Sequence, residues 1–204
     1  MTPARNRVTP MGEIVAVPLR GAWTGNRGRL HRGREIARFH ASDLWIVCAL
    51  EFRGRWSEQW QPHQFTWLYF HDEAVALAAG HRPCAECRRA SYNAYRAAWA
   101  EGLGVAAPSA KELNRQLHGE RIHRGTHQRR LHRLPWRELP DGAFVLLDDT
   151  PALVRGDRLT EWTTTGYGSF RARPTRGDAE IITPPSSLAT LAAGYPVQID
   201  SGAG

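Results

Sequence analysis

The segment "GHRPCAECRR", residues 80–89, places two of the three cysteines of this 204-residue chain in one short turn. Cys84 and Cys87 are separated by two residues, a spacing that brings two thiolates to a single tetrahedral zinc ion. Pro83 stiffens the turn just before the first cysteine, and two arginines follow the second one. Two ligands do not complete a zinc site, so the segment predicts that other ligands come from elsewhere in the chain.

A predicted strand and a short helix lead into this turn. The aromatic run "FTWLYF", residues 65–70, is typical of a compact strand. Asp72 is placed to cap a helix over residues 73–79, and Gly80 is expected to end that helix in the left-handed conformation.

Two further helices are predicted after the turn. Tyr92, Tyr95 and Trp99 are three and four residues apart, which places them on one face of a helix and favours a role in the core. The sequence "SAKE", residues 109–112, is a capping box that opens the next helix. The tract at residues 118–133 is rich in arginine and histidine and lacks a sustained apolar face, so it is predicted to be a basic loop or linker.

The third cysteine lies in "LWIVCALEF", residues 44–52, which is apolar on both faces and therefore predicts an interior strand. Soft sulfur donors tend to converge where zinc is bound. Cys48 is thus the expected third ligand, although a buried apolar thiol is the alternative interpretation.

The stretch "LYFHDEAVALAAGHRPCAEC", residues 68–87, resembles the second half of the Ada-type metal-binding domain. In that family an aromatic strand, a short helix and an Arg-Pro-Cys-x-x-Cys turn supply two of four zinc-binding cysteines. The resemblance, which covers about residues 65–89, implies bound zinc. The family's upstream pair of ligands is absent here, since Cys48 stands alone, so its thiolate methyl-acceptor activity is not carried over and a structural zinc is expected. More loosely, the whole chain resembles a family of uncharacterised bacterial proteins with "GNRG", "HRPCxECRR" and "TPPSS" landmarks, which implies no activity.

A histidine is the expected fourth ligand, giving a Cys3His zinc site. His31 follows the glycine turn "GNRG", and a turn before a strand can bring its imidazole beside the strand that carries Cys48. His40 and His71 remain alternatives, and His81 is a weaker one because it replaces an aromatic residue that does not bind metal in the Ada-type family.

Two other functions of a Cys-x-x-Cys turn are less favoured by the spacing. A thioredoxin-like redox pair follows a strand and opens a helix, whereas a helix is also predicted before this turn. A zinc deaminase combines His-x-Glu with a later Pro-Cys-x-x-Cys, and the chain contains both "HDE" and "PCAEC". Only nine residues lie between Glu73 and Pro83, too few for the helix and strand that should separate the two motifs.

The order of predicted elements favours an α+β fold. Residues 1–105 form a small zinc-stabilised mixed region, residues 106–137 a basic helical connector, and residues 138–204 a small β-rich region. The length allows all of this to pack as one domain.

Charge is distributed unevenly. The chain has a net charge of +7, yet residues 138–204 hold five arginines against nine acids, so the first 137 residues carry 22 basic side chains against 11 acidic ones. Such asymmetry favours contact with a polyanion, nucleic acid and DNA above all, although an arginine-rich surface can also do no more than interact with water. The candidate phosphate-contacting side chains are Arg27, Arg32, Arg34, Arg88, Arg89, Arg129, Arg130 and Arg133.

The sequence as a whole predicts a cytoplasmic zinc-binding protein that contacts nucleic acid, with DNA repair or processing as the expected context. An odd, low cysteine count argues against a disulfide framework, and no apolar run approaches the roughly 20 residues of a membrane span. The alternative is an enzyme, a metal-dependent nuclease or a base-modifying enzyme, whose pocket lies between the N-terminal and C-terminal regions.

Overall fold

The computed structural model describes residues 3–54 and 58–203 and has the α+β fold that the sequence predicts. The N-terminal sheet has the order β2-β1-β7-β3-β6-β8, comprising β1 (Arg7–Val8), β2 (Ile14–Val15), β3 (Trp23–Asn26), β6 (Ile46–Cys48), β7 (Leu68–Phe70) and β8 (Arg82–Pro83). A separate hairpin is formed by β4 (His31–Arg32) and β5 (Glu35–Ile36).

The C-terminal sheet has the order β13-β12-β11-β10-β14-β9. Its strands are β9 (His132–Pro135), β10 (Phe144–Leu147), β11 (Thr150–Arg155), β12 (Arg158–Thr163), β13 (Gly166–Ala172) and β14 (Asp178–Ile181). The helices are α1 (Glu73–Ala78), α2 (Arg89–Leu103), α3 (Ala110–Arg121) and α4 (Pro185–Ala192), with 3-10 turns at Trp136–Glu138 and Ser201–Ala203. In the described part of the chain, no helix is both long and apolar enough to cross a membrane.

Local sequence signals explain where the helices begin and end. The carboxylate of Asp72 accepts a hydrogen bond from the backbone N–H of Val75 at 2.8 Å and so caps α1. Gly80 follows this helix with a φ of +87°, and a Cβ atom there would lie 2.5 Å from the side chain of Arg121. At the start of α3, Ser109 and Glu112 form the predicted capping box.

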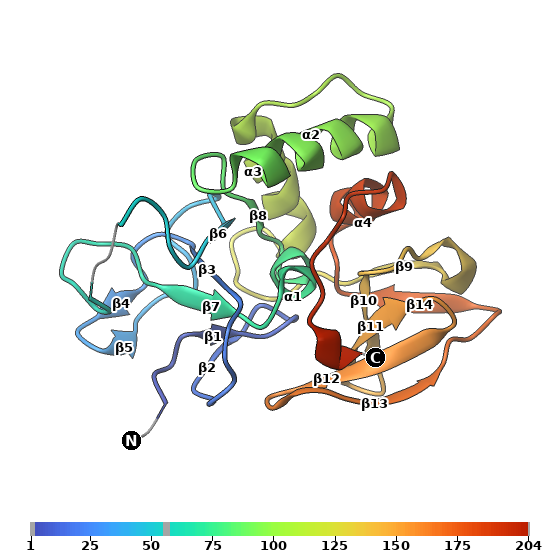
Figure 1. Ribbon diagram of the computed structural model, residues 1–204, viewed down its shortest axis with the longest axis horizontal. Helices are drawn as coiled ribbons and strands as arrows, with labels where there is room; N and C mark the ends of the chain where they lie inside the picture. Colours follow the sequence, from blue (N-terminus) through green and yellow to red (C-terminus); the bar gives the residue numbers. More distant parts are fainter. Residues whose placement is uncertain (1–2, 55–57, 204) are drawn as a thin grey trace.

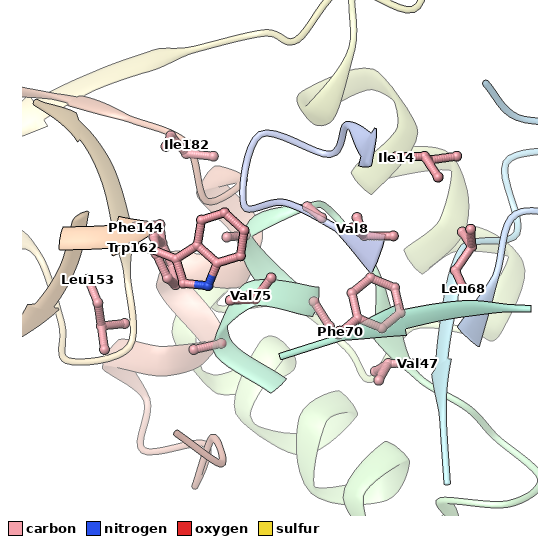
Figure 2. Close-up of a cluster of buried hydrophobic side chains, with 14 of the residues drawn as sticks. Val8, Ile14, Val47, Leu68, Phe70, Val75, Phe144, Leu153, Trp162 and Ile182 are labelled. Atoms are coloured by element: carbon pink, nitrogen blue, oxygen red, sulfur yellow. The ribbon is translucent and has the colours of Figure 1, made fainter. Parts of the chain in front are cut away.

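The two sheets share one hydrophobic core with α1 at its centre (Figure 1). Figure 2 shows Val75 of α1 between Phe70 of the N-terminal sheet and Phe144 and Trp162 of the C-terminal sheet, and these side chains belong to one buried cluster. Because the apolar face of each sheet is covered by the same short helix, residues 1–105 and 138–204 pack against each other as one unit.

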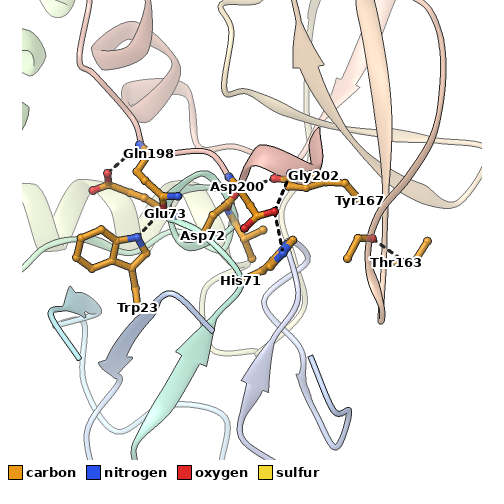
Figure 3. A network of polar contacts seen from close by, with 11 residues as sticks. Trp23, His71, Asp72, Glu73, Thr163, Tyr167, Gln198, Asp200 and Gly202 are labelled. Carbon is orange, nitrogen blue, oxygen red and sulfur yellow. Dashed lines mark hydrogen bonds and ion pairs between the residues drawn. The ribbon is translucent and has the colours of Figure 1, made fainter. Parts of the chain in front are cut away.

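Buried polar contacts reinforce this packing between the two regions (Figure 3). The hydroxyl of Tyr167 donates to the carboxylate of Asp72 at 2.7 Å, and the backbone N–H of Asp200 donates to the same oxygen at 3.0 Å. The neighbouring Glu73 accepts from the hydroxyl of Tyr195 at 2.8 Å. Burial raises the pKa of Asp72, while these hydrogen bonds and that from Val75 oppose the rise.

The segment at residues 118–133 is more ordered than the predicted loop or linker. Helix α3 continues to Arg121, which is fully buried and donates to the backbone oxygens of Gly80 and Asp43, each at 2.8 Å. An isolated bridge joins Ile122 to Arg129, and β9 follows. Apolar periodicity could not predict this order because a buried arginine, and not an apolar stripe, anchors the segment.

Candidate metal centre

Pairing of two strands brings Cys48 beside the Cys-x-x-Cys turn. Strand β6, which ends at Cys48, runs parallel to β8, with Val47 opposite Pro83. The ladder continues one residue further, since the backbone N–H of Cys84 donates to the carbonyl oxygen of Val47 at 2.9 Å. On its other side β6 pairs with β3, where Gly25 is required because a Cβ atom would lie 2.1 Å from the carbonyl oxygen of Ile46. Cys48 is thus on the interior strand that the sequence predicts.

The three cysteines form a group with the dimensions of a metal site. The sulfur atoms of Cys48, Cys84 and Cys87 all lie within 4.8 Å of one another. Zn–S bonds of about 2.3 Å in tetrahedral geometry separate two sulfur atoms by roughly 3.8 Å. A small contraction would therefore let all three sulfur atoms bind one ion, and three thiolates are the donors that soft or borderline metals such as zinc prefer.

The protons of these thiols are distributed unequally. The Cys48 thiol donates hydrogen bonds to Cys84 and Cys87, which raises the pKa of Cys48 and lowers the pKa of the other two. The pKa of Cys84 falls to about 5, because the backbone N–H groups of Glu86 and Cys87 also stabilise its thiolate. Two thiolates close together at neutral pH are poised to bind a cation.

A pocket of about 280 Å³ opens onto the sulfur atoms. All three cysteines line it, together with Asn26, Glu86 and the aromatic side chains of Phe52, Phe65 and Trp67. Its rim carries exposed apolar side chains, of which Leu50 is 47% exposed and Phe65 is 39% exposed. A metal held by the three cysteines would consequently have its fourth position on the side of this pocket, open to water or to a small ligand.

The structure does not bring His31 to the cysteines. Its Nδ1 atom lies 2.7 Å from the hydroxyl of Thr66, and its Nε2 atom lies 3.1 Å from the carbonyl oxygen of Gln61. Within residues 3–54 and 58–203, no histidine, aspartate or glutamate joins the three-cysteine group. The other candidates are engaged elsewhere, because His81 accepts from Arg27 and His71 lies 3.7 Å from Asp200.

The predicted phosphate-contacting arginines divide into two sets. Arg27 and Arg88 are buried, and the half-buried Arg129 donates to the carbonyl oxygens of Ala78 and Ile182. The buried Arg88 lies over the ring of Trp23 at 3.8 Å. None of these three forms an exposed surface in this structure, contrary to the expectation. The exposed set is Arg32, Arg34, Arg89, Arg130 and Arg133.

Sequence reasoning missed a second group of functional side chains, which lies around Trp45. The guanidinium groups of Arg27 and Arg121 lie over the Trp45 ring at 3.9 and 3.8 Å, and the rings of His81 and His118 are 5.2 and 6.3 Å from it. The density of arginine and histidine in residues 118–133 was the available signal. It was interpreted as surface charge, because nothing local shows that a guanidinium group is buried.

Known proteins provide no guide to either group of side chains. No family model matches this chain, and neither a curated protein nor a solved structure is similar to it to a significant degree.

Proposed function

We propose that this protein binds one zinc ion through Cys48, Cys84 and Cys87 and uses the zinc-stabilised N-terminal half to contact nucleic acid, DNA first of all, in repair or processing. Zinc has a structural role in this proposal, because it ties β6 to the turn that opens α2. The three-cysteine group supports the metal. Zinc is preferred over other ions because structural zinc sites are commonly rich in cysteine.

The observation that carries the nucleic-acid part is a contrast in ion pairing. Across the described residues, none of the exposed arginines in the N-terminal half that were predicted to contact phosphate forms an ion pair with a carboxylate. In the C-terminal sheet, by comparison, Arg171 binds both Asp148 and Glu161, at 2.9 and 2.8 Å. Positive charge that the protein leaves uncompensated is available to phosphate groups.

A salt titration tests the nucleic-acid proposal. Replacing Arg89, Arg130 and Arg133 together with alanine is expected to weaken DNA binding and to reduce the slope of log K against log salt by roughly 2 to 3, since each phosphate contact contributes about 0.9. Fluorescence anisotropy with labelled duplex and single-stranded DNA measures both quantities. The matched control replaces Arg137, Arg158 and Arg171, which face acidic partners, and is expected to keep the slope. Equal slopes in the two triple variants would contradict the proposal.

A second candidate function, a metal-dependent nuclease or base-modifying enzyme, is favoured by one observation. The pocket that opens onto the three sulfur atoms is walled by Phe52, Phe65 and Trp67, which suit a planar ring, and Glu86 lines it as a possible proton carrier. Three protein ligands and one open position are the arrangement of catalytic zinc. The pocket lies within the N-terminal region and not between the two regions as expected.

Product analysis tests this second function. Zinc-loaded protein is incubated with single-stranded and duplex DNA, and strand cleavage is followed by denaturing electrophoresis and base changes by nucleoside mass spectrometry. Product formation that is lost in Glu86→Gln while zinc is retained would support an enzyme. DNA that stays chemically unchanged while binding tightly would contradict it and favour the binding protein.

A further inference from the structure

Arg27 is a buried cation without an anionic partner. Its side chain is 0% exposed, and both terminal nitrogens lack a hydrogen-bond partner. Its Nε atom donates to His81, and its guanidinium carbon lies 3.9 Å from the centre of the Trp45 ring and 4.7 Å from that of Phe39. Aromatic faces compensate only part of the cost of burying a charge.

Two more guanidinium groups add to this positive charge. Arg121 lies against the other contact with Trp45, and Arg129 is close enough to lower the pKa of both Arg27 and Arg121. Burial is the larger cause of both shifts, yet guanidinium groups keep their proton in proteins. Among the described residues, no carboxylate forms an ion pair with any of the three.

Arg88 shows how this protein treats a buried arginine that serves structure alone. It also lies on a tryptophan face, that of Trp23 at 3.8 Å, but its Nη1 atom is 2.6 Å from a carboxylate oxygen of Glu73. Arg27 has the same burial and the same stacking without the acid. The missing partner of Arg27 is therefore expected to come from outside the chain.

A groove of about 670 Å³ lies directly in front of this cluster. Phe39, whose ring contacts Arg27, forms part of its wall, and His118, whose Nδ1 atom is 2.8 Å from a terminal nitrogen of Arg121, forms another part. None of the described residues that line the groove is acidic. Its basic and imidazole side chains are Arg5, Arg38, His40, His118 and His127.

We propose that this groove binds a phosphoryl group, held by His40, His118 and Arg38 and neutralised by the guanidinium groups of Arg27 and Arg121 behind them. Arginine and imidazole donors are suited to phosphate oxygens, and a dianion matches the surplus of positive charge. The volume of the groove suits a ligand as large as a nucleotide. The phosphoryl group can belong to a nucleic-acid backbone or to a small phosphate ester, and the site depends on neither the metal nor the exposed arginines.

The test is calorimetric titration with inorganic phosphate at neutral pH and constant chloride. The Arg27→Met variant is expected to bind phosphate at least about tenfold more weakly, because it removes a charge several ångströms from the dianion. Its unliganded form is expected to be as stable as the parent or more so, since an unpaired buried charge has been replaced by an apolar side chain. Loss of binding together with undiminished stability distinguishes a ligand site from a structural arginine.

Two further variants complete the design. Arg96→Met is the matched control, because Arg96 is half-buried, donates to the carbonyl oxygens of Ala107 and Pro108 and does not line the groove. It is expected to bind phosphate like the parent. Arg38→Ala changes an exposed residue of the groove and leaves the core intact, and it is expected to weaken phosphate binding severalfold. Unchanged affinity in either Arg27→Met or Arg38→Ala overturns the proposal, as does a parent protein that binds no phosphate.

A histidine titration gives an independent signal from the same groove. Burial and the nearby charges of Arg121 and His40 lower the pKa of His118 to about 4, with Asp43 opposing them. A phosphate dianion beside this ring favours the protonated imidazole, so saturating phosphate is expected to raise the pKa of His118, as followed by NMR. A pKa that does not move when phosphate is added counts against the site.

A short single-stranded DNA without terminal phosphates separates the two sources of the phosphoryl group. DNA that competes with inorganic phosphate and is weakened by Arg27→Met supports both this site and the proposed function. Phosphate binding without any DNA binding supports the site, assigns it to a small phosphate ester and rejects the nucleic-acid function. DNA binding that is unaffected by Arg27→Met, with no binding of phosphate, overturns the site and leaves the nucleic-acid function in place.

Discussion

The Cys84→Ser protein is expected to be purified without zinc and to unfold about 10 °C below the parent chain. Cys84 lies at the junction of β8 and the turn, where its backbone pairs with Val47 and its sulfur faces those of Cys48 and Cys87. Without the metal, nothing covalent would link the end of β6 to the turn before α2. Elemental mass spectrometry of the purified protein measures the metal, and differential scanning calorimetry measures the unfolding temperature.

His31→Ala is the control for this experiment. Its imidazole contacts Thr66 and Gln61 and is not in the cysteine group. This variant should therefore keep its zinc, although the lost hydrogen bonds lower its stability by about 1 to 2 kcal/mol. Loss of zinc from His31→Ala would restore the Cys3His site predicted from sequence and contradict the arrangement seen here.

Cys48→Ser decides whether the third thiol is a ligand. A buried apolar cysteine would tolerate serine with full zinc content, whereas a ligand would not. We expect zinc to be lost from this variant, since its sulfur atom lies within 4.8 Å of the other two. A parent protein that contains no metal and does not take up zinc after reduction would refute the metal centre altogether.

Local sequence patterns were sufficient to predict the helices and the cysteine turn. Asp72 caps α1, Gly80 follows it in the left-handed conformation, and Ser109 opens α3, because capping depends on residues only a few positions apart. The interior position of Cys48 was also predictable, since a strand that is apolar on both faces needs a neighbour on each side.

The position of His31 could not be predicted because it depends on strand pairing. The prediction placed His31 beside the strand of Cys48, but the glycine turn sends the chain into the separate hairpin of β4 and β5. The partner that does lie beside Cys48 is β8, through a parallel contact between segments 36 residues apart in sequence. Pairing over such a separation has no local signature.

The buried arginines were missed for a related reason. An arginine in a sequence resembles a surface charge, and its burial depends on which aromatic rings and carbonyl oxygens the fold brings around it. Arg121 is an example, because Trp45 and the oxygens of Gly80 and Asp43 all come from distant segments. Charge counting therefore predicted a basic half correctly from its composition but could not tell its surface from its core.

Arg88→Met is expected to destabilise the protein by about 3 to 5 kcal/mol, because it leaves the carboxylate of Glu73 buried without its cation. Glu73 is 1% exposed, and its remaining contacts are the hydroxyl of Tyr195 and the backbone N–H of Gln198 (Figure 3). This ion pair joins α1 to the residue that caps α2, so its loss affects the junction of both regions. Urea unfolding followed by circular dichroism measures the change.

The double variant Glu73→Gln/Arg88→Met separates the ion pair from simple packing. A glutamine can still accept from Tyr195, and no charge is left unpaired, so the double variant is expected to recover at least about 2 kcal/mol of the stability lost in Arg88→Met. Additive losses in the two single variants would mean that the two charges do not interact. Because Arg88 stacks on Trp23 beneath the surface, recovery would also show that this arginine stabilises the fold and is not available to a phosphate, in contrast to Arg27.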